Sequence, residues 1–110
     1  MAQQDYQAAL DWYVKARNLF PQYPDPYFHI GEIFILKGDY AQAQQNLQKA
    51  LAIDPTNPLS MHLLALVNHH TGNPTLAEEW MLNAINHQSA PQVLASWWAE
   101  LGDGRRERYH

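Results

Sequence analysis

The stretch that decides the fold runs from Gly38 to Pro55 and reads GDYAQAQQNLQKALAIDP. Moving this pattern by one period, so that Ala43 falls on Ala9 or on Ala77, places side chains of the same kind at the same points. Three columns recur in this way: Ala9/Ala43/Ala77, Tyr13/Leu47/Met81 and Ala16/Ala50/Ala84. A period of about 34 residues is typical of helical repeat proteins, in which a two-helix unit buries its apolar face only by stacking on its neighbours.

Apolar spacing around this stretch predicts two helices in each repeat. Tyr27, Ile30 and Phe34 share one helical face, and Gly38 stands where a glycine ends a helix. Asp39 is a suitable cap for the helix that follows. Over the whole chain the pattern predicts an all-α fold of six helices, at 3–19, 25–37, 40–52, 59–70, 74–87 and 91–101.

The residues in these columns resemble the tetratricopeptide repeat family, whose pattern is W-x₂-L-G-x₂-Y, then A-x₃-F, then P. Residues 24–57 match it throughout, with Tyr27-x₂-Ile30-Gly31-x₂-Phe34, Ala43-x₃-Leu47 and Pro55. Residues 58–90 match less closely, because Asn68 and Pro74 stand in columns that are aromatic in the family. The resemblance implies an α-solenoid of helix-turn-helix repeats wound as a right-handed superhelix.

We therefore expect a single domain over residues 1–104. It comprises a half repeat at 3–23, full repeats at 24–57 and 58–90, and a C-terminal capping helix at 91–101. Gly102-Asp103-Gly104 is expected to end that last helix. Residues 105–110, with three arginines, are then expected to form a basic, flexible tail.

Composition narrows the function classes. The 110 residues are 46% hydrophobic and 16% charged, which indicates a folded domain rather than a disordered chain. A formal net charge of −4 argues against general nucleic-acid binding. No apolar run is long enough to insert into a membrane, and the N-terminus lacks the pattern of a signal peptide, so we expect a cytoplasmic protein. Without cysteine there are no disulfides, thiolate metal sites or cysteine nucleophiles.

The resemblance implies a peptide-binding groove on the concave side, lined by the first helix of each repeat. The inward-facing residues that hairpin packing does not use are Asp25, Phe28, Glu32, Ile35, Leu59, His62, Leu66 and His69. Contact between neighbouring first helices is the alternative explanation for the apolar members. No lysine or arginine falls in this set, so we expect no clamp for a terminal carboxylate. The predicted partner is an apolar or mildly basic protein segment rather than an acidic C-terminus.

No catalytic arrangement appears, and we expect a non-enzymatic scaffold or adaptor without a cofactor. His62 and His69 stand about two helical turns, or roughly 10 Å, apart, which is too far for a shared metal ion. A metal-responsive histidine surface is therefore the least favoured hypothesis. Glu78 and Glu79 are adjacent and diverge, as on a solvated face.

The tryptophans and the first helix leave alternatives open. Trp98 matches the packing column of a first helix, so Trp97 is expected to be partly exposed, either for binding or as part of a cap. Trp12 and Trp80 are expected to pack against adjoining helices. The first helix lacks a preceding partner, which fits a piece of a longer repeat protein, a homo-oligomer or an N-terminal cap. Self-assembly through this helix and the repeat ends is accordingly the alternative function.

Overall fold

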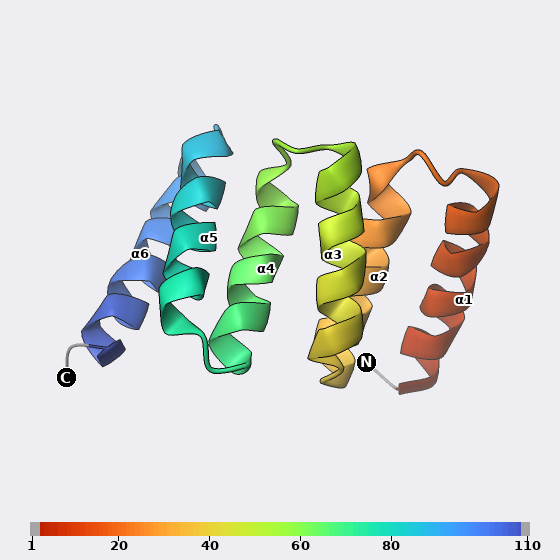
Figure 1. Ribbon diagram of the computed structural model, residues 1–110, viewed down its shortest axis with the longest axis horizontal. Helices are drawn as coiled ribbons and strands as arrows, with labels where there is room; N and C mark the ends of the chain where they lie inside the picture. The colour runs from red at the N-terminus through yellow and green to blue at the C-terminus, as the bar shows by residue number, and fades with distance from the viewer. Residues whose placement is uncertain (1–2, 109–110) are drawn as a thin grey trace. The chain divides into compact units, whose positions relative to one another are not determined.

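The computed structural model describes residues 3–108 (Figure 1). Over this range its regular secondary structure consists of α-helices joined by short turns. Its helices are α1 (Gln3–Leu19), α2 (Pro24–Lys37), α3 (Tyr40–Ile53), α4 (Pro58–His70), α5 (Pro74–His87) and α6 (Pro91–Arg108). The predicted all-α fold of six helices is thus confirmed for the described residues. The first five predicted helices agree closely with α1 to α5 at both ends.

The predicted end of the last helix is wrong. Instead of stopping at Gly102-Asp103-Gly104, α6 continues to Arg108. A glycine ends a helix when its backbone turns left-handed, and Gly102 does not have a positive φ. Within a helix a glycine costs only about 1 kcal/mol relative to alanine, which the helix can absorb. Arg105–Arg108 are therefore helical, residues 109–110 lie outside the described range, and a flexible tail stays a prediction.

The links inside the two complete hairpins have the same geometry. Gly38 and Gly72 have φ values of 82° and 84°, in the left-handed region that glycine enters without strain. In each link the amides of the glycine and of the next residue donate to carbonyls of the last helical turn, over 2.8–3.4 Å. The predicted role of Gly38 is confirmed. Such a tight link makes α2 antiparallel to α3, and α4 antiparallel to α5 (Figure 1).

Side-chain caps fix the starts of two helices. The Asp39 carboxylate accepts a hydrogen bond from the Gln42 backbone amide at 3.2 Å, which confirms the predicted cap of α3. At the start of α4 the Asn57 side-chain oxygen accepts from the amides of Leu59 and Ser60, at 2.9 and 3.3 Å. Capping residues in the sequence therefore mark the start of the second helix in the first hairpin and of the first helix in the second hairpin.

The chain divides into two compact units, residues 1–55 and 56–110, which we describe separately. In the first, α2 packs against both α1 and α3. Its core contains the predicted columns, with Ile30, Ala43, Leu47 and Ala50 almost fully buried. Gly31 permits this close approach, because a Cβ atom there would lie 2.7 Å from Cγ of Leu47.

In the second unit α5 packs against both α4 and α6. Five of its buried positions repeat buried positions of the first hairpin one period later, whereas Ala77, the equivalent of Ala43, is only half-buried. They are Met61, Leu64, Ala65, Met81 and Ala84. Asn68, in a column that is aromatic in the pattern, is also buried and donates from its side-chain amide to the Leu64 carbonyl at 2.8 Å.

Candidate functional site

One candidate surface is a line of side chains along α2, which we call the α2 row: Asp25, Phe28, Glu32 and Ile35. Spacings of three and four positions place them on one face of the helix. Asp25 and Glu32 are exposed, while Phe28 and Ile35 are half-buried. The row therefore presents two accessible carboxylates alternating with two partly accessible apolar side chains.

His29 connects the α2 row to α1. Its ring stacks on that of Tyr13, with centroids 4.7 Å apart and planes 17° apart, and meets the Phe28 ring edge-on at 5.1 Å. Nδ1 of His29 lies 3.6 Å from a carboxylate oxygen of Glu32. These contacts orient Phe28 and Glu32 from one side, and about half of the Glu32 side chain stays open to solvent.

A second line, the α4 row, comprises Leu59, His62, Leu66 and His69. Leu59 and His69 are exposed and Leu66 is half-buried. His62 differs from the other three because its side chain is only 16% exposed. In the second unit, then, three of the four predicted residues remain accessible and the fourth is largely covered.

The cover over His62 comes from α6. Its imidazole stacks on the indole of Trp97, with centroids 4.7 Å apart and planes 13° apart. Nε2 of His62 also lies 2.8 Å from a carboxylate oxygen of Glu100, about one helical turn further along α6. This histidine is thus engaged by its own chain, and it anchors α6 beside the α4 row.

The expected exposure of the two adjacent tryptophans is reversed. Trp97 is 4% exposed and Trp98 is 51% exposed. The face of α6 that turns inward carries Trp97 and, about one turn later, the buried Leu101. Because neighbouring helix positions diverge by about 100°, Trp98 is directed away from this face. The prediction of a partly exposed Trp97 is therefore wrong.

Glu100 was not among the predicted surface residues, although the period could have indicated it. Glu32, Leu66 and Glu100 follow one another at intervals of one period, so the three share one position of the repeat. The contact with His62 shows that the surface of the α4 row includes a carboxylate from α6. Both units therefore present acidic and apolar side chains together.

Trp12 also differs from expectation. It is 71% exposed on α1 rather than packed against an adjoining helix. The Lys15 ammonium group lies 5.4 Å from the centroid of its ring, a weak cation–π contact at the surface. Trp80, the corresponding residue of α5, is half-buried.

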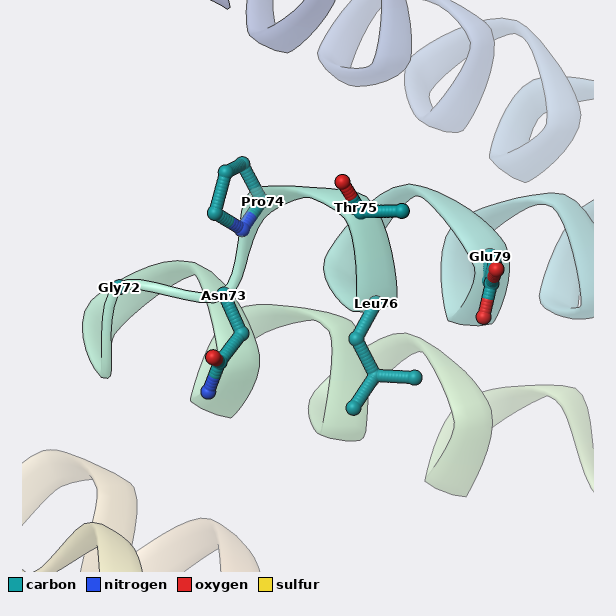
Figure 2. Close-up of a pocket in the computed structure, with 6 residues that line it drawn as sticks. All are labelled: Gly72, Asn73, Pro74, Thr75, Leu76 and Glu79. Carbon is teal, nitrogen blue, oxygen red and sulfur yellow. The ribbon is translucent and has the colours of Figure 1, made fainter.

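Figure 2 shows an open hollow at the turn between α4 and α5. It is lined by Gly72, Asn73, Pro74, Thr75, Leu76 and Glu79. The Asn73 side-chain amide donates to the Thr71 hydroxyl at 3.3 Å, so this polar group is paired within the turn. With no buried polar or charged group in its lining, we assign this hollow no function.

Metal binding and membrane insertion find no support in the part of the chain that the structure describes. Among residues whose side chains are placed, no three histidine or acidic groups lie close enough to hold a metal ion. Over residues 3–108, no helix is both long and apolar enough to cross a membrane.

Antiparallel hairpins, a regular repeat period and small-residue columns in each core define a helical repeat protein. Comparison with known families identifies the kind of repeat, because a family model described as "TPR repeat" matches residues 31–72. This family match agrees with the sequence relatives and the solved structures described in the next two paragraphs. Together they show that the chain belongs to the tetratricopeptide repeat family.

Sequence relatives support this assignment over most of the chain. Tetratricopeptide repeat protein 7B of Homo sapiens is 35% identical over 89 residues, which cover 81% of this chain and 10% of that protein. Anaphase-promoting complex subunit 6 of Arabidopsis thaliana is 30% identical over 97 residues, covering 88% of this chain and 18% of the subunit. The chain thus spans only about a tenth to a fifth of these relatives.

Solved structures agree in fold. The crystal structure of the APC/C hetero-tetramer Cut9-Hcn1 matches with a TM-score of 0.84 and 26% identity, over 96% of this chain and 21% of that one. SycD, the type III secretion translocator chaperone of Yersinia enterocolitica, matches with a TM-score of 0.89 and 14% identity, over 97% of this chain and 77% of its own. At that identity, the likeness to SycD shows the fold alone.

Proposed function

We propose that the chain is a non-enzymatic protein-interaction module, acting as a scaffold or adaptor, and that the α2 row binds an apolar or mildly basic segment of a partner protein. The observation that carries this proposal is the alternation of Asp25 and Glu32 with Phe28 and Ile35 on one helix face. The hairpin core uses the other column of α2, so packing against α3 does not require these four side chains.

The charges of both rows favour such a partner. The α2 row and α4 row contain no lysine or arginine, and Glu100 adds a carboxylate beside the α4 row. A segment with apolar side chains could contact Phe28 and Ile35 while its basic groups approach Asp25 and Glu32. The same carboxylates would repel an acidic segment.

Relatives support the general function without identifying a partner. Anaphase-promoting complex subunit 6 is, by its name, a component of a protein complex. The tetratricopeptide repeat fold supports many different binding functions, so the partner must follow from the side chains and not from the fold. That the α2 row and the α4 row together line a concave groove, and that the protein is cytoplasmic, stay predictions.

Selection from a random peptide library would test the proposal whichever protein supplies the segment. We expect selected peptides to be enriched in apolar residues together with lysine or arginine. Fluorescence anisotropy with one labelled hit would then give the Kd. We expect Phe28→Ala and Glu32→Arg each to raise the Kd by about tenfold or more, and added salt to weaken binding by the wild type.

A charge reversal elsewhere serves as the matched control. Glu79 is exposed on α5, a helix that contributes to neither row, so Glu79→Arg changes the net charge equally and should leave the Kd within about twofold. Selected peptides rich in aspartate and glutamate would contradict the proposed specificity. Equal weakening by Glu79→Arg and Glu32→Arg would show that net charge, and not the α2 row, governs binding.

A further inference from the structure

Each unit contains a histidine within ion-pair distance of an exposed carboxylate. In the first unit, Nδ1 of His29 lies 3.6 Å from a carboxylate oxygen of Glu32, three residues further along α2. In the second, Nε2 of His62 on α4 lies 2.8 Å from a carboxylate oxygen of Glu100 on α6. The side chains of Glu32 and Glu100 are 48% and 45% exposed, so a partner can reach both. The same pair of chemical groups thus occurs on the candidate surface of each unit.

An aromatic ring from another helix fixes the position of each histidine. The ring of His29 stacks on Tyr13 of α1, and the ring of His62 stacks on Trp97 of α6, both with centroids 4.7 Å apart. The interplanar angles are 17° and 13°. An aromatic face attracts a cation as well as stacking on a neutral ring. Each imidazole therefore keeps its place next to the carboxylate whether or not it carries a proton.

From these two pairs we infer that protons compete with a basic partner for the carboxylates of Glu32 and Glu100. Histidine is the side chain that normally changes charge between about pH 8 and 5. Once protonated, His29 and His62 are cations beside these carboxylates, so a lysine or arginine of the partner is attracted less strongly. The protein should therefore bind a basic segment at neutral pH and release it in mildly acidic solution. This inference rests on the proposed function, because it concerns the regulation of that binding.

The other charged groups around His29 keep their charge over this pH range. Tyrosine ionises at about pH 10 and carboxylic acids at about pH 4, so Tyr13 stays neutral and Asp25 stays negative. Arg17, half-buried one turn after Tyr13 on α1, stays positive. The other charged residues of α1 are exposed: Asp5, Asp11 and Lys15. On the opposite side of α2, the single charged residue of α3 is the exposed Lys49.

The surroundings of His62 include further histidines. On α4 itself His69 and His70 are exposed, about two turns further along the helix. On α6 the described charged group is Glu100. The titratable residues of α5, which packs on α4, are Glu78, Glu79 and His87. Only histidines among these groups change charge near neutral pH, so the experiment must separate them from His62.

The net charge of the chain changes in the same direction. The formal value of −4 counts all six histidines as neutral, so six added protons would reverse its sign. A basic segment would then lose the general attraction of an acidic protein as well as the local one. The two contributions can be separated, because most of the histidines lie outside the two pairs.

Fluorescence anisotropy at about pH 7.5 and pH 5.5 tests the inference. The probe is a selected apolar peptide with lysine or arginine, without histidine, aspartate or glutamate and with blocked ends, so that its own charge stays constant. We expect the Kd of wild type to rise about fivefold or more at the lower pH, as for unit charges about 4 Å apart in water. In His29→Phe/His62→Phe, the ratio of the two Kd values should fall to within about twofold of one. Phenylalanine can stack on Tyr13 and Trp97 but cannot gain a proton, and circular dichroism would verify folding.

A second double variant is the matched control. His70→Gln/His87→Gln removes the same number of protonatable rings from exposed residues outside both rows, and should keep the pH ratio of wild type. A wild-type Kd that is equal at the two pH values would overturn the inference. An undiminished ratio in His29→Phe/His62→Phe, or equal loss of the ratio in both double variants, would also overturn it. No peptide binding by wild type at neutral pH would instead contradict the proposed function, and this inference with it.

Reciprocal linkage provides a test without substitutions. If protons weaken peptide binding, bound peptide must weaken proton binding by the same factor. In an NMR titration, we expect His29 to be half-protonated at a pH lower by about 0.5 when the peptide is saturating, as a fivefold effect requires. His87, outside both rows, should titrate at the same pH with and without peptide. A His29 titration that does not move, or that moves to higher pH, would overturn the inference.

Discussion

Gly31 occupies the closest approach between the helices of the first unit. A methyl group at this residue would lie 2.7 and 2.9 Å from Cγ and Cδ2 of Leu47, and 3.3 Å from the Ala43 carbonyl oxygen. Leu47 is fully buried, so it cannot move aside cheaply.

We therefore expect Gly31→Ala to lower the free energy of unfolding by about 1–3 kcal/mol, since overpacking outweighs the gain in helix propensity. Urea denaturation followed by circular dichroism would measure the change. Gly102→Ala is the matched control, because nothing lies within 4 Å of a Cβ at that helical residue. There the same substitution should raise stability by about 0.5–1 kcal/mol. Stabilisation at both glycines would contradict the packing argument.

Ser60 is a buried polar residue of the second unit. It is fully buried in the first turn of α4, and its hydroxyl oxygen has no hydrogen-bond partner among the described residues. A buried hydroxyl without a partner costs about 1–3 kcal/mol of desolvation.

Ser60→Ala should accordingly leave stability unchanged or raise it by about 1 kcal/mol, measured from the midpoint of chemical denaturation. Ser96→Ala, at an exposed serine of α6, reports the contribution of helix propensity alone. A loss of stability specific to Ser60→Ala would indicate that the hydroxyl makes a favourable interaction.

At the scale of elements, Trp97 holds α6 in place. It is buried, stacks on His62 of α4 and belongs to the helix that packs on α5. Trp98, the next residue, is half-exposed.

We expect Trp97→Ala to destabilise the fold by about 3–5 kcal/mol and to detach α6, seen as a loss of helical signal. Trp98→Ala should change stability by less than about 0.5 kcal/mol, because this side chain is exposed. Similar costs for the two variants would mean that α6 does not pack as described.

The elements were predictable where local chemistry determines them. Gly38 and Asp39 mark a helix end and a helix start through backbone conformation and capping, which depend on adjacent residues only. Gly102 was misread because glycine permits a left-handed turn without requiring one. The cover over His62 was also missed, since its partner Glu100 is distant in the sequence and joins it through tertiary packing. In the α2 row Asp25 and Glu32 are exposed and Phe28 and Ile35 are half-buried, and the binding role of this row stays a prediction.

At the scale of the whole molecule, burial is unevenly distributed along the chain. Between residues 5 and 19 no side chain of α1 is fully buried, whereas α3 buries Ala43, Asn46, Leu47 and Ala50. Local opening costs least where few side chains are buried.

Amide hydrogen exchange followed by mass spectrometry should therefore be faster in α1 than in α3. Equal exchange rates in the two helices would contradict this expectation.

The two glycine links also bear on how such a chain changes over evolution. Gly38 and Gly72 adopt nearly the same φ one period apart, with the same columns between them. A duplicated segment one period long would bring its own turn, its own capping residues and a face that fits its neighbours. An insertion a few residues shorter than one period would shift the later column residues to a different side of the helix that receives it. A gene duplication that adds one whole period can therefore lengthen this molecule, because the added helices reuse the existing helix–helix interface.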